Sequence, residues 1–312
     1  TRPWERPRFS NQSLFLLLHH QRVKNITTRS GFPRQEGTRD LGRNRTSEAT
    51  TMSLDSMQLL ECSKKGDLEG MKKIAKAHPG ALHASDMGGF TPAHYAVRYG
   101  YEEMVDYLYD ADPTLLAAKN NGGNTPAHWA AIHGNTKCLK KLYKKDPELL
   151  NIKDHDGYTC AHCAAKHRKD DSLSFVLDKL PDLAHAHDKD GRYPAHYSAF
   201  YGGEDSLQMM MDLDDKVMQC RDKIGAGLAH YAASGGHEGV LEWIHNKVPD
   251  LLVATDMNGG TPAHWAAKAR RDYELRKLYA KRPELANTRD RDGKLPDDYL
   301  GEGSGYSNDF AG

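Results

Sequence analysis

The chain has 312 residues, which is enough for one large domain or two ordinary ones, and Lys plus Arg balances Asp plus Glu at 43 each. This balance does not indicate a nucleic-acid-binding protein, and no run of 18 apolar residues is present, so we expect no membrane insertion. The five scattered cysteines do not resemble a disulfide framework and favour a reducing, intracellular setting.

Residues 1–51 show no periodic pattern and contain ten basic and four acidic residues, which leaves the rest of the chain at a net charge of −6. The first methionine is Met52. We expect a disordered basic segment, or one that is not natively translated so that Met52 is the true start. A transit peptide is a further alternative, whereas "LFLLL" at 14–18 is shorter than the core of a signal peptide.

A repeat begins after Met52. Six segments start 34 residues apart: "TPAHYAVRYG" at 91, "TPAHWAAIHG" at 125, "TCAHCAAKHR" at 159, "YPAHYSAFYG" at 193, "GLAHYAASGG" at 227 and "TPAHWAAKAR" at 261. The register continues to "LPDDYL" at 295. We expect an N-terminal capping repeat at 52–86, six full repeats at 87–290, a C-terminal cap stub at 291–300 and a flexible tail at 301–312.

Each unit predicts two helices and a turn. Thr91 is a suitable N-cap, Pro92 fits the first helical position, and Gly100 suits the C-cap. A second helix follows, with apolar residues three apart, and Pro113 ends it. A long loop then leads to an Asp- and Gly-rich turn such as "DHDG" at 154.

The repeated T-P-A-H-[YW]-A-[AV] segment resembles the ankyrin-repeat signature, with Ala in place of the usual Leu. The resemblance covers about 245 residues and implies an all-α ankyrin-repeat α-solenoid of about seven repeats. It also implies a non-catalytic scaffold without a cofactor. In that family the histidine bonds the Thr hydroxyl and nearby backbone. Tyr193 and Gly227 replace that Thr, so we expect the loosest junction there.

The stretch "DHDGYTCAHCAAKH" at 154–167 permits a zinc half-site, a redox dithiol or a calcium loop when it is read alone. The repeat register explains it differently, because Cys160 occupies the proline column and Cys163 the aromatic column. A calcium loop would need Glu where Ala165 stands. Register histidines on neighbouring helices are too far apart to share an ion. We expect no metal, and a metal or redox protein using Cys160 and Cys163 is the lesser alternative.

The column after each histidine is aromatic in five of six repeats: Tyr95, Trp129, Tyr197, Tyr231 and Trp265. In several ankyrin relatives such residues line the concave face and contact an extended peptide. We therefore expect a partner-binding stripe, with packing of the rings as core as the alternative. Further surface candidates lie near the helix ends and at the turn tips: Arg98, Tyr99, His133, Phe200, Tyr201, Phe90, Tyr158 and Arg192.

The resemblance thus implies a monomer that binds another protein or peptide segment, in the cytoplasm or the nucleus. The alternative is that the chain is the repeat portion of a larger signalling enzyme or channel.

Overall fold

The structure, a computed structural model, describes residues 53–300. Within this range the regular elements are α-helices and short 3₁₀ helices, without a strand, so the all-α repeat fold is confirmed there. The predictions for residues 1–51, for Met52 and for the tail at 301–312 lie outside the described residues.

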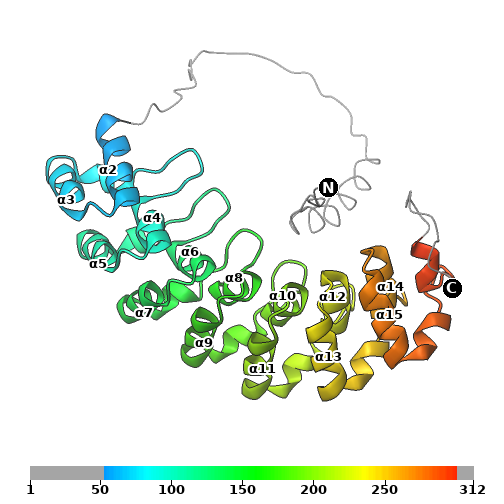
Figure 1. The fold of residues 1–312 in the computed structure, drawn as a ribbon. Helices are drawn as coiled ribbons and strands as arrows, with labels where there is room; N and C mark the ends of the chain where they lie inside the picture. The colour runs from blue at the N-terminus through cyan, green and yellow to red at the C-terminus, as the bar shows by residue number, and fades with distance from the viewer. Residues whose placement is uncertain (1–52, 301–312) are drawn as a thin grey trace, which may run out of the picture. The chain divides into compact units, whose positions relative to one another are not determined.

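Helices alternate between two rows (Figure 1). We call the first helix of each full repeat an inner helix: α4 Pro92–Tyr99, α6 Pro126–His133, α8 Cys160–Lys166, α10 Pro194–Tyr201, α12 Leu228–Gly235 and α14 Pro262–Lys268. The second, or outer, helices are α5 Glu102–Ala111, α7 Thr136–Lys145, α9 Asp170–Lys179, α11 Glu204–Leu213, α13 Glu238–Lys247 and α15 Asp272–Lys281. A pair without the Thr-Pro-x-His segment precedes them: α2 Leu54–Lys65 and α3 Leu68–Ala77.

The inner helices begin and end where the sequence predicts. Thr91 precedes α4 with extended backbone, Pro92 is its first residue, and Gly100 follows it in the left-handed conformation, with φ 78°. In two repeats an arginine takes the place of this glycine. Arg168 and Arg270 have φ values of 53° and 55° and are the only non-glycine residues with positive φ in the described part of the chain.

The segment after each outer helix is a 3₁₀ helix rather than the expected loop. After α5, the carboxylate of Asp112 accepts a hydrogen bond from the backbone N–H of Thr114, and Pro113 opens the element. The turn buries Leu115 and Leu116 against the helices. The set comprises η1 Pro79–His83, η2 Pro113–Ala117, η3 Pro147–Leu150, η4 Pro181–His185, η5 Asp215–Gln219, η6 Pro249–Val253 and η7 Pro283–Asn287. An eighth 3₁₀ helix, η8 Pro296–Tyr299, follows the last turn at the position where a further inner helix would begin.

Consecutive turns are joined by backbone hydrogen bonds. The N–H of Asn121 donates to the carbonyl of Gly88, and the N–H of His155 donates to the carbonyl of Gly122. The same bond recurs through the next four turns, so six bonds of 2.8–3.1 Å link seven turns. Each repeat is therefore bonded at its tip to the repeat before it.

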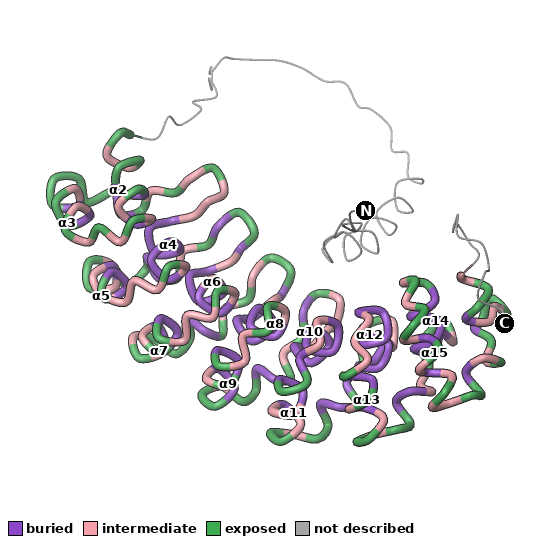
Figure 2. The backbone as a smooth tube through the Cα atoms, viewed as in Figure 1, coloured by how far each residue is buried: buried purple, intermediate pink, exposed green. Residues whose placement is uncertain are grey.

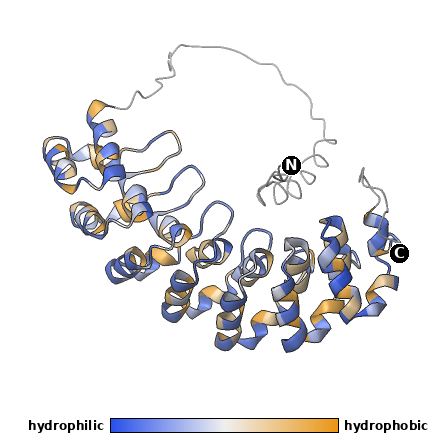
Figure 3. Cartoon of the chain, viewed as in Figure 1, coloured by the Kyte–Doolittle hydropathy of each residue, from blue (hydrophilic) through white to orange (hydrophobic). Residues whose placement is uncertain are grey.

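The core lies between the two rows of helices. Buried residues concentrate on the inner helices (Figure 2), while the outer helices turn hydrophilic residues outward (Figure 3). Toward the C-terminal end, α10, α12 and α14 pack against one another more extensively than α11, α13 and α15 do. The described repeats therefore form a row that curves toward its inner helices (Figure 1).

The expected C-terminal cap stub contains η8, which packs against α14. The hydroxyl of Tyr299 donates to Asp290, in the turn that precedes it. This short element covers the last inner helix with the same kind of contact that a full repeat would make.

Candidate functional site

The rings of the aromatic column have a structural role that the sequence analysis did not predict. Four of the five rings are paired with an aspartate nine residues earlier, at the start of the preceding turn. The donors are the hydroxyls of Tyr95, Tyr197 and Tyr231 and the indole N–H of Trp265, bonded to Asp86, Asp188, Asp222 and Asp256 over 2.5–2.9 Å. The other carboxylate oxygen of each aspartate accepts two backbone N–H groups of its turn, as Asp86 does from Gly88 and Phe90. The column therefore anchors the turns to the inner helices.

Burial divides the predicted stripe. Tyr95 and Tyr231 are 7% exposed and Tyr197 only 1%, so these rings pack as core and offer a partner almost no surface. Phe200, expected at the surface, is also buried, at 4% exposed. Trp129 and Trp265 are partly exposed. The three tyrosines therefore pack as core, and only the two tryptophans remain candidates for a binding surface.

Trp129 differs from the rest of the column. Asn120 stands where the other repeats shown above have Asp, and its Oδ1 accepts the N–H groups of Gly122 and Asn124. No second carboxylate oxygen is present, and the buried indole Nε1 of Trp129 has no hydrogen-bond partner among residues 53–300.

Five predicted residues meet around Trp129 and form what we call the N-terminal aromatic cluster: Phe90, Arg98, Tyr99, Trp129 and His133. The ring of Phe90 meets Trp129 edge-on, with centroids 4.7 Å apart, and His133 stacks on Trp129 at 5.4 Å. The guanidinium of Arg98 lies 5.4 Å from the Trp129 ring and 5.5 Å from the Tyr99 ring. Tyr99 and His133 are exposed, and the other three are partly so.

This cluster combines exposed aromatic area with a positioned cation. The rings offer flat apolar surface, and a guanidinium held between two rings loses little further freedom when it binds a carboxylate. The arrangement contains no nucleophile with an adjacent base. It is suited to recognition rather than to bond making.

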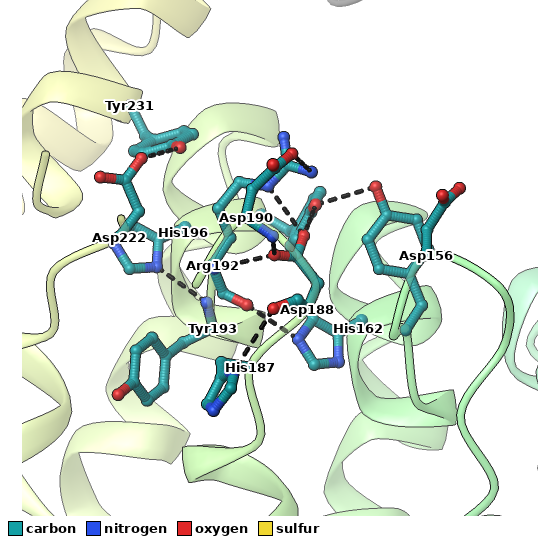
Figure 4. A network of polar contacts seen from close by, with 12 residues as sticks. Asp156, His162, His187, Asp188, Asp190, Arg192, Tyr193, His196, Asp222 and Tyr231 are labelled. Atoms are coloured by element: carbon teal, nitrogen blue, oxygen red, sulfur yellow. Dashed lines mark hydrogen bonds and ion pairs between the residues drawn. The ribbon is translucent and has the colours of Figure 1, made fainter. Parts of the chain in front are cut away.

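A second group of predicted residues is engaged internally (Figure 4). Arg192 Nε lies 2.7 Å from Asp188 Oδ2 and Nη2 lies 2.8 Å from Asp190 Oδ2. The Tyr197 hydroxyl donates to Asp188, and the hydroxyl oxygens of Tyr197 and Tyr158 are 2.9 Å apart. Arg192 was expected to extend a surface at the turn tip, but only 11% of its side chain is exposed.

The arginine decides the charge state of this turn. Burial alone raises the pKa of a carboxyl group, but the charge of Arg192 and the hydrogen bonds from Tyr197 and Arg192 outweigh it at Asp188, whose pKa is lowered. Asp222 occupies the same place in the next repeat without such an arginine. Burial is the largest influence there, and the pKa of Asp222 is raised. The Arg192 network thus stabilises a buried ionised aspartate.

Tyr201, the last surface candidate, is half-buried and meets Phe200 edge-on at 5.0 Å. A polar contact that the sequence reading missed lies at the inner-helix C-termini. Asn135 Nδ2 donates to the carbonyls of Val97 and Arg98, one repeat earlier, and Arg271 Nε likewise donates to Ser234. These side chains cap the preceding repeat's helix.

The register histidines form the predicted clasp and also bridge the repeats. In each, Nδ1 accepts the backbone N–H of the residue before the inner helix at 2.9–3.2 Å. Nε2 donates to a carbonyl 30 residues on, in the next turn, over 2.8–3.2 Å. Tyr193 and Gly227 keep the backbone half of the clasp and lack the Thr hydroxyl. Because both ring nitrogens are occupied, these histidines are unsuited to holding a metal.

The C-x-x-C pair is buried. The Cys160 thiol donates to the carbonyl of Leu150, and Cys163 is 4% exposed. Burial raises the pKa of Cys160 to about 12 and raises that of Cys163 as well, which opposes formation of the thiolate needed for metal binding or redox exchange. Among residues 53–300 no group of three His, Cys, Asp or Glu side chains is placed to hold a metal ion.

Comparison with known proteins bears on these repeats. A family model described as ankyrin repeats (3 copies) matches residues 59–151. A comparison with curated proteins found no match to the chain. Residues 152–300 continue the matched segment with the same 34-residue spacing, helix pairs and histidine clasps.

Proposed function

The chain is an ankyrin-repeat protein, and from this premise we propose that it is a non-catalytic scaffold whose N-terminal aromatic cluster binds an extended segment of another protein. Ankyrin repeats are generally modules for protein–protein interaction and are typically non-catalytic. The observation that carries the proposal is the placement of Arg98 between Tyr99 and Trp129, where the C-terminal end of α4 meets α6. No described helix is long and apolar enough to cross a membrane.

The cluster has the composition of a binding hot spot. Trp, Tyr and Arg are the residue types that most often dominate the energy of protein interfaces. Here they converge with Phe90 and His133 on one side of two neighbouring repeats.

The repeat spacing limits the shape of the ligand. Packed helices lie roughly 8–10 Å apart, and an extended peptide advances about 3.3 Å per residue. One repeat therefore spans about three peptide residues. We expect a partner segment to place an apolar anchor at Trp129 and a second anchor about three residues away, at Tyr99.

The test is a peptide-display selection on the full chain, followed by affinity measurements on Tyr99→Ala and Trp129→Ala. We expect each substitution to weaken binding of the selected peptides by about tenfold or more, as at other aromatic hot spots. Circular dichroism would show whether each variant keeps its helices.

Tyr273→Ala is the matched control. Tyr273 lies on outer helix α15 and is 54% exposed, close to the 47% of Tyr99, so its removal deletes a similar area from the opposite row. We expect this control to bind as the parent does. If Tyr99→Ala and Trp129→Ala also bind like the parent, the cluster is not the partner site.

A further inference from the structure

The helix pairs are divided by charge. The six inner helices contain no Asp or Glu, whereas five of the six outer helices begin with an acidic residue: Glu102, Asp170, Glu204, Glu238 and Asp272. Cations gather at and just after the C-terminal ends of the inner helices. They are Arg98, Lys166, Arg168, Lys169, Lys268, Arg270 and Arg271. The C-terminal ends of α4, α8 and α14 are therefore cationic, although the chain as a whole is neutral.

Two of these cations stand on strained backbone. Arg168 and Arg270 adopt the left-handed conformation at a position where the other four inner helices are followed by glycine. A side chain in that conformation costs about 1 kcal/mol relative to glycine. Neither the fold nor the turn requires arginine there, since four repeats close with glycine. An outlier of this kind is a reason to look for a function of the side chain.

The chain neutralises lysines on its outer helices but not three of the cations near α4 and α8. On the outer row, Lys141 pairs with Asp106 and Lys281 with Glu242, each at 2.5 Å. Within residues 53–300, Arg98, Arg168 and Lys169 form no ion pair with a carboxylate, and Arg168 is exposed. Grouped cations without counter-charges repel one another, and an anionic partner relieves that repulsion.

Two histidines lie between these cations, and burial together with the nearby positive charges lowers their pKa values. Burial, followed by the charges of Arg98 and Lys169, lowers the pKa of His133. Burial, followed by Lys166, His133 and Lys169, lowers the pKa of His167. The geometry agrees: the Lys169 side chain lies against the end of α6, where a Cβ atom on Gly134 would be 3.0 Å from Lys169 Cδ, and Arg98 lies 5.4 Å from the Trp129 ring of the same helix. Cations of the first and third of these repeats therefore both reach α6 and form one strip.

Compensation of helix dipoles explains only part of this strip. A cation in the last turn of a helix stabilises it by about 0.3–1 kcal/mol, which suits Arg98 and Lys166. Arg168 lies beyond the end of α8, where this effect declines, and glycine at that position would close the helix at lower cost.

We propose that the strip from Arg98 to Arg168 is a docking site for an acidic peptide segment of a partner protein. The inference rests on the proposed function and adds the chemistry of its partner. α4 and α8 are two repeats apart, or about 16–20 Å, so carboxylates that reach Arg98 and Arg168 lie about five or six residues apart along an extended chain. The anchor at Trp129 falls between them.

The strip fits a single peptide better than a nucleic acid. It is bordered by acidic residues on both sides: Asp156 at a turn tip, and Asp170, Asp171, Glu204 and Asp205 at the starts of the outer helices. Those carboxylates repel a wide polyanion, whereas a narrow chain with spaced carboxylates can avoid them.

Arg168→Gly is the sharpest test, because it removes the charge and restores the residue that four other repeats use. We expect this variant to unfold at the same temperature as the parent or a higher one, and to bind selected peptides about fivefold more weakly. Lys144→Gln is the matched control, since Lys144 is an exposed lysine on outer helix α7. It should bind as the parent does.

The probes are the peptides that a random 12-residue display library yields on the full chain, and versions of them with Gln and Asn in place of Glu and Asp. We expect the selected sequences to contain acidic residues about five or six positions apart, the amide versions to bind at least about tenfold more weakly, and affinity to fall with added salt. A single-stranded oligonucleotide of 20 thymidines should bind no better than the amide versions.

The outcomes separate this inference from the function on which it rests. Peptides that need Trp129 and Tyr99 but lack acidic residues and bind Arg168→Gly normally would overturn the inference and leave the proposed function standing. A library without any binder, or binders indifferent to Trp129, Tyr99 and Arg168, would overturn both. Tighter binding of the oligonucleotide than of every peptide would show that the strip serves a nucleic acid.

Discussion

The turn aspartates decide what each aromatic residue of the inner helices can do. Where Asp is present, as at Asp188 and Asp256, one carboxylate oxygen holds the turn and the other accepts the ring's hydroxyl or N–H. Where Asn120 is present, only the turn half of this arrangement is made. The amide NH2 of Asn120 replaces the second carboxylate oxygen of an Asp, and this leaves the indole N–H of Trp129 without an acceptor.

Replacing Asn120 with Asp should stabilise the protein. The added oxygen would accept the indole N–H of Trp129, as Asp256 accepts that of Trp265 at 2.9 Å. Satisfying a buried donor contributes about 1–2 kcal/mol. Chemical denaturation of the parent and of Asn120→Asp measures the difference.

Asp256→Asn is the reciprocal variant and should destabilise by a similar amount, because it deprives Trp265 of its acceptor. If both substitutions change stability in the same direction, the pairing between turn and ring does not govern these positions.

Single residues also show where sequence reading succeeds. The Thr–His clasp was predicted from the resemblance to ankyrin repeats, and in the structure a spacing of three residues brings the two side chains together in the first helical turn. Its second half, from Nε2 to a carbonyl 30 residues on, depends on how repeats stack and has no local signature. The pairing of Asp86 with Tyr95 did have a signal, because an acidic or amide residue stands nine positions before each aromatic residue of the column.

At the scale of helices, α10 and α12 approach each other closely. A Cβ atom on Gly235 would lie only 2.2 Å from the carbonyl oxygen of Phe200, so glycine permits this contact. The close approach also accompanies the burial of Phe200, which sequence reading had placed at the surface.

Gly235→Ala should push these two helices apart. The added methyl group cannot fit without a backbone shift, and we expect a loss of about 1–3 kcal/mol of stability despite the better helix propensity of Ala. Hydrogen exchange should increase most in α10 and α12.

Gly80→Ala is the control for this substitution, because a Cβ at Gly80 meets no atom within 4 Å. Equal stability of the two variants would contradict the close packing described here.

The ends of the inner helices were largely predictable. Thr-Pro marks the start and Gly marks the end, and both capping effects depend only on residues next to the helix end. The 3₁₀ helices were not predicted from the sequence. A proline that ends one α-helix can also begin a 3₁₀ helix when the leucines that follow it become buried, as Leu115 and Leu116 do after Pro113. Burial of individual aromatic residues could not be predicted either, since it depends on how closely the next repeat approaches.

Across the whole array, the six buried clasps tie stability to pH. Burial lowers the pKa of His94, His162 and His230 to about 4 and that of His196 to about 3, and it also lowers the pKa of His128 and His264. In the unfolded chain a histidine titrates near 6.5. Below that pH the unfolded state binds more protons than the native state, so stability falls as the pH falls toward 4.

We therefore expect a steep loss of stability between about pH 6.5 and 4. In the middle of that window, each histidine clasp whose native pKa is near 4 adds about 1.4 kcal/mol per pH unit to the slope of the unfolding free energy against pH. Urea unfolding at a series of pH values would give the slope. His94→Gln should reduce the slope by about one proton, and a midpoint that stays constant from pH 7 to 5 would contradict the assignment of neutral histidines.

The direction of the clasp has a consequence for synthesis on the ribosome. Every register histidine gives its Nε2 proton to a carbonyl that lies 30 residues later in the chain, and the last finds its acceptor in Lys294, within the C-terminal stub. A newly made repeat therefore emerges with its histidine still exposed to water, and it is completed only when the following turn has left the exit tunnel. Folding during translation should advance one unit behind elongation, and a stalled chain should always end in one unfinished repeat.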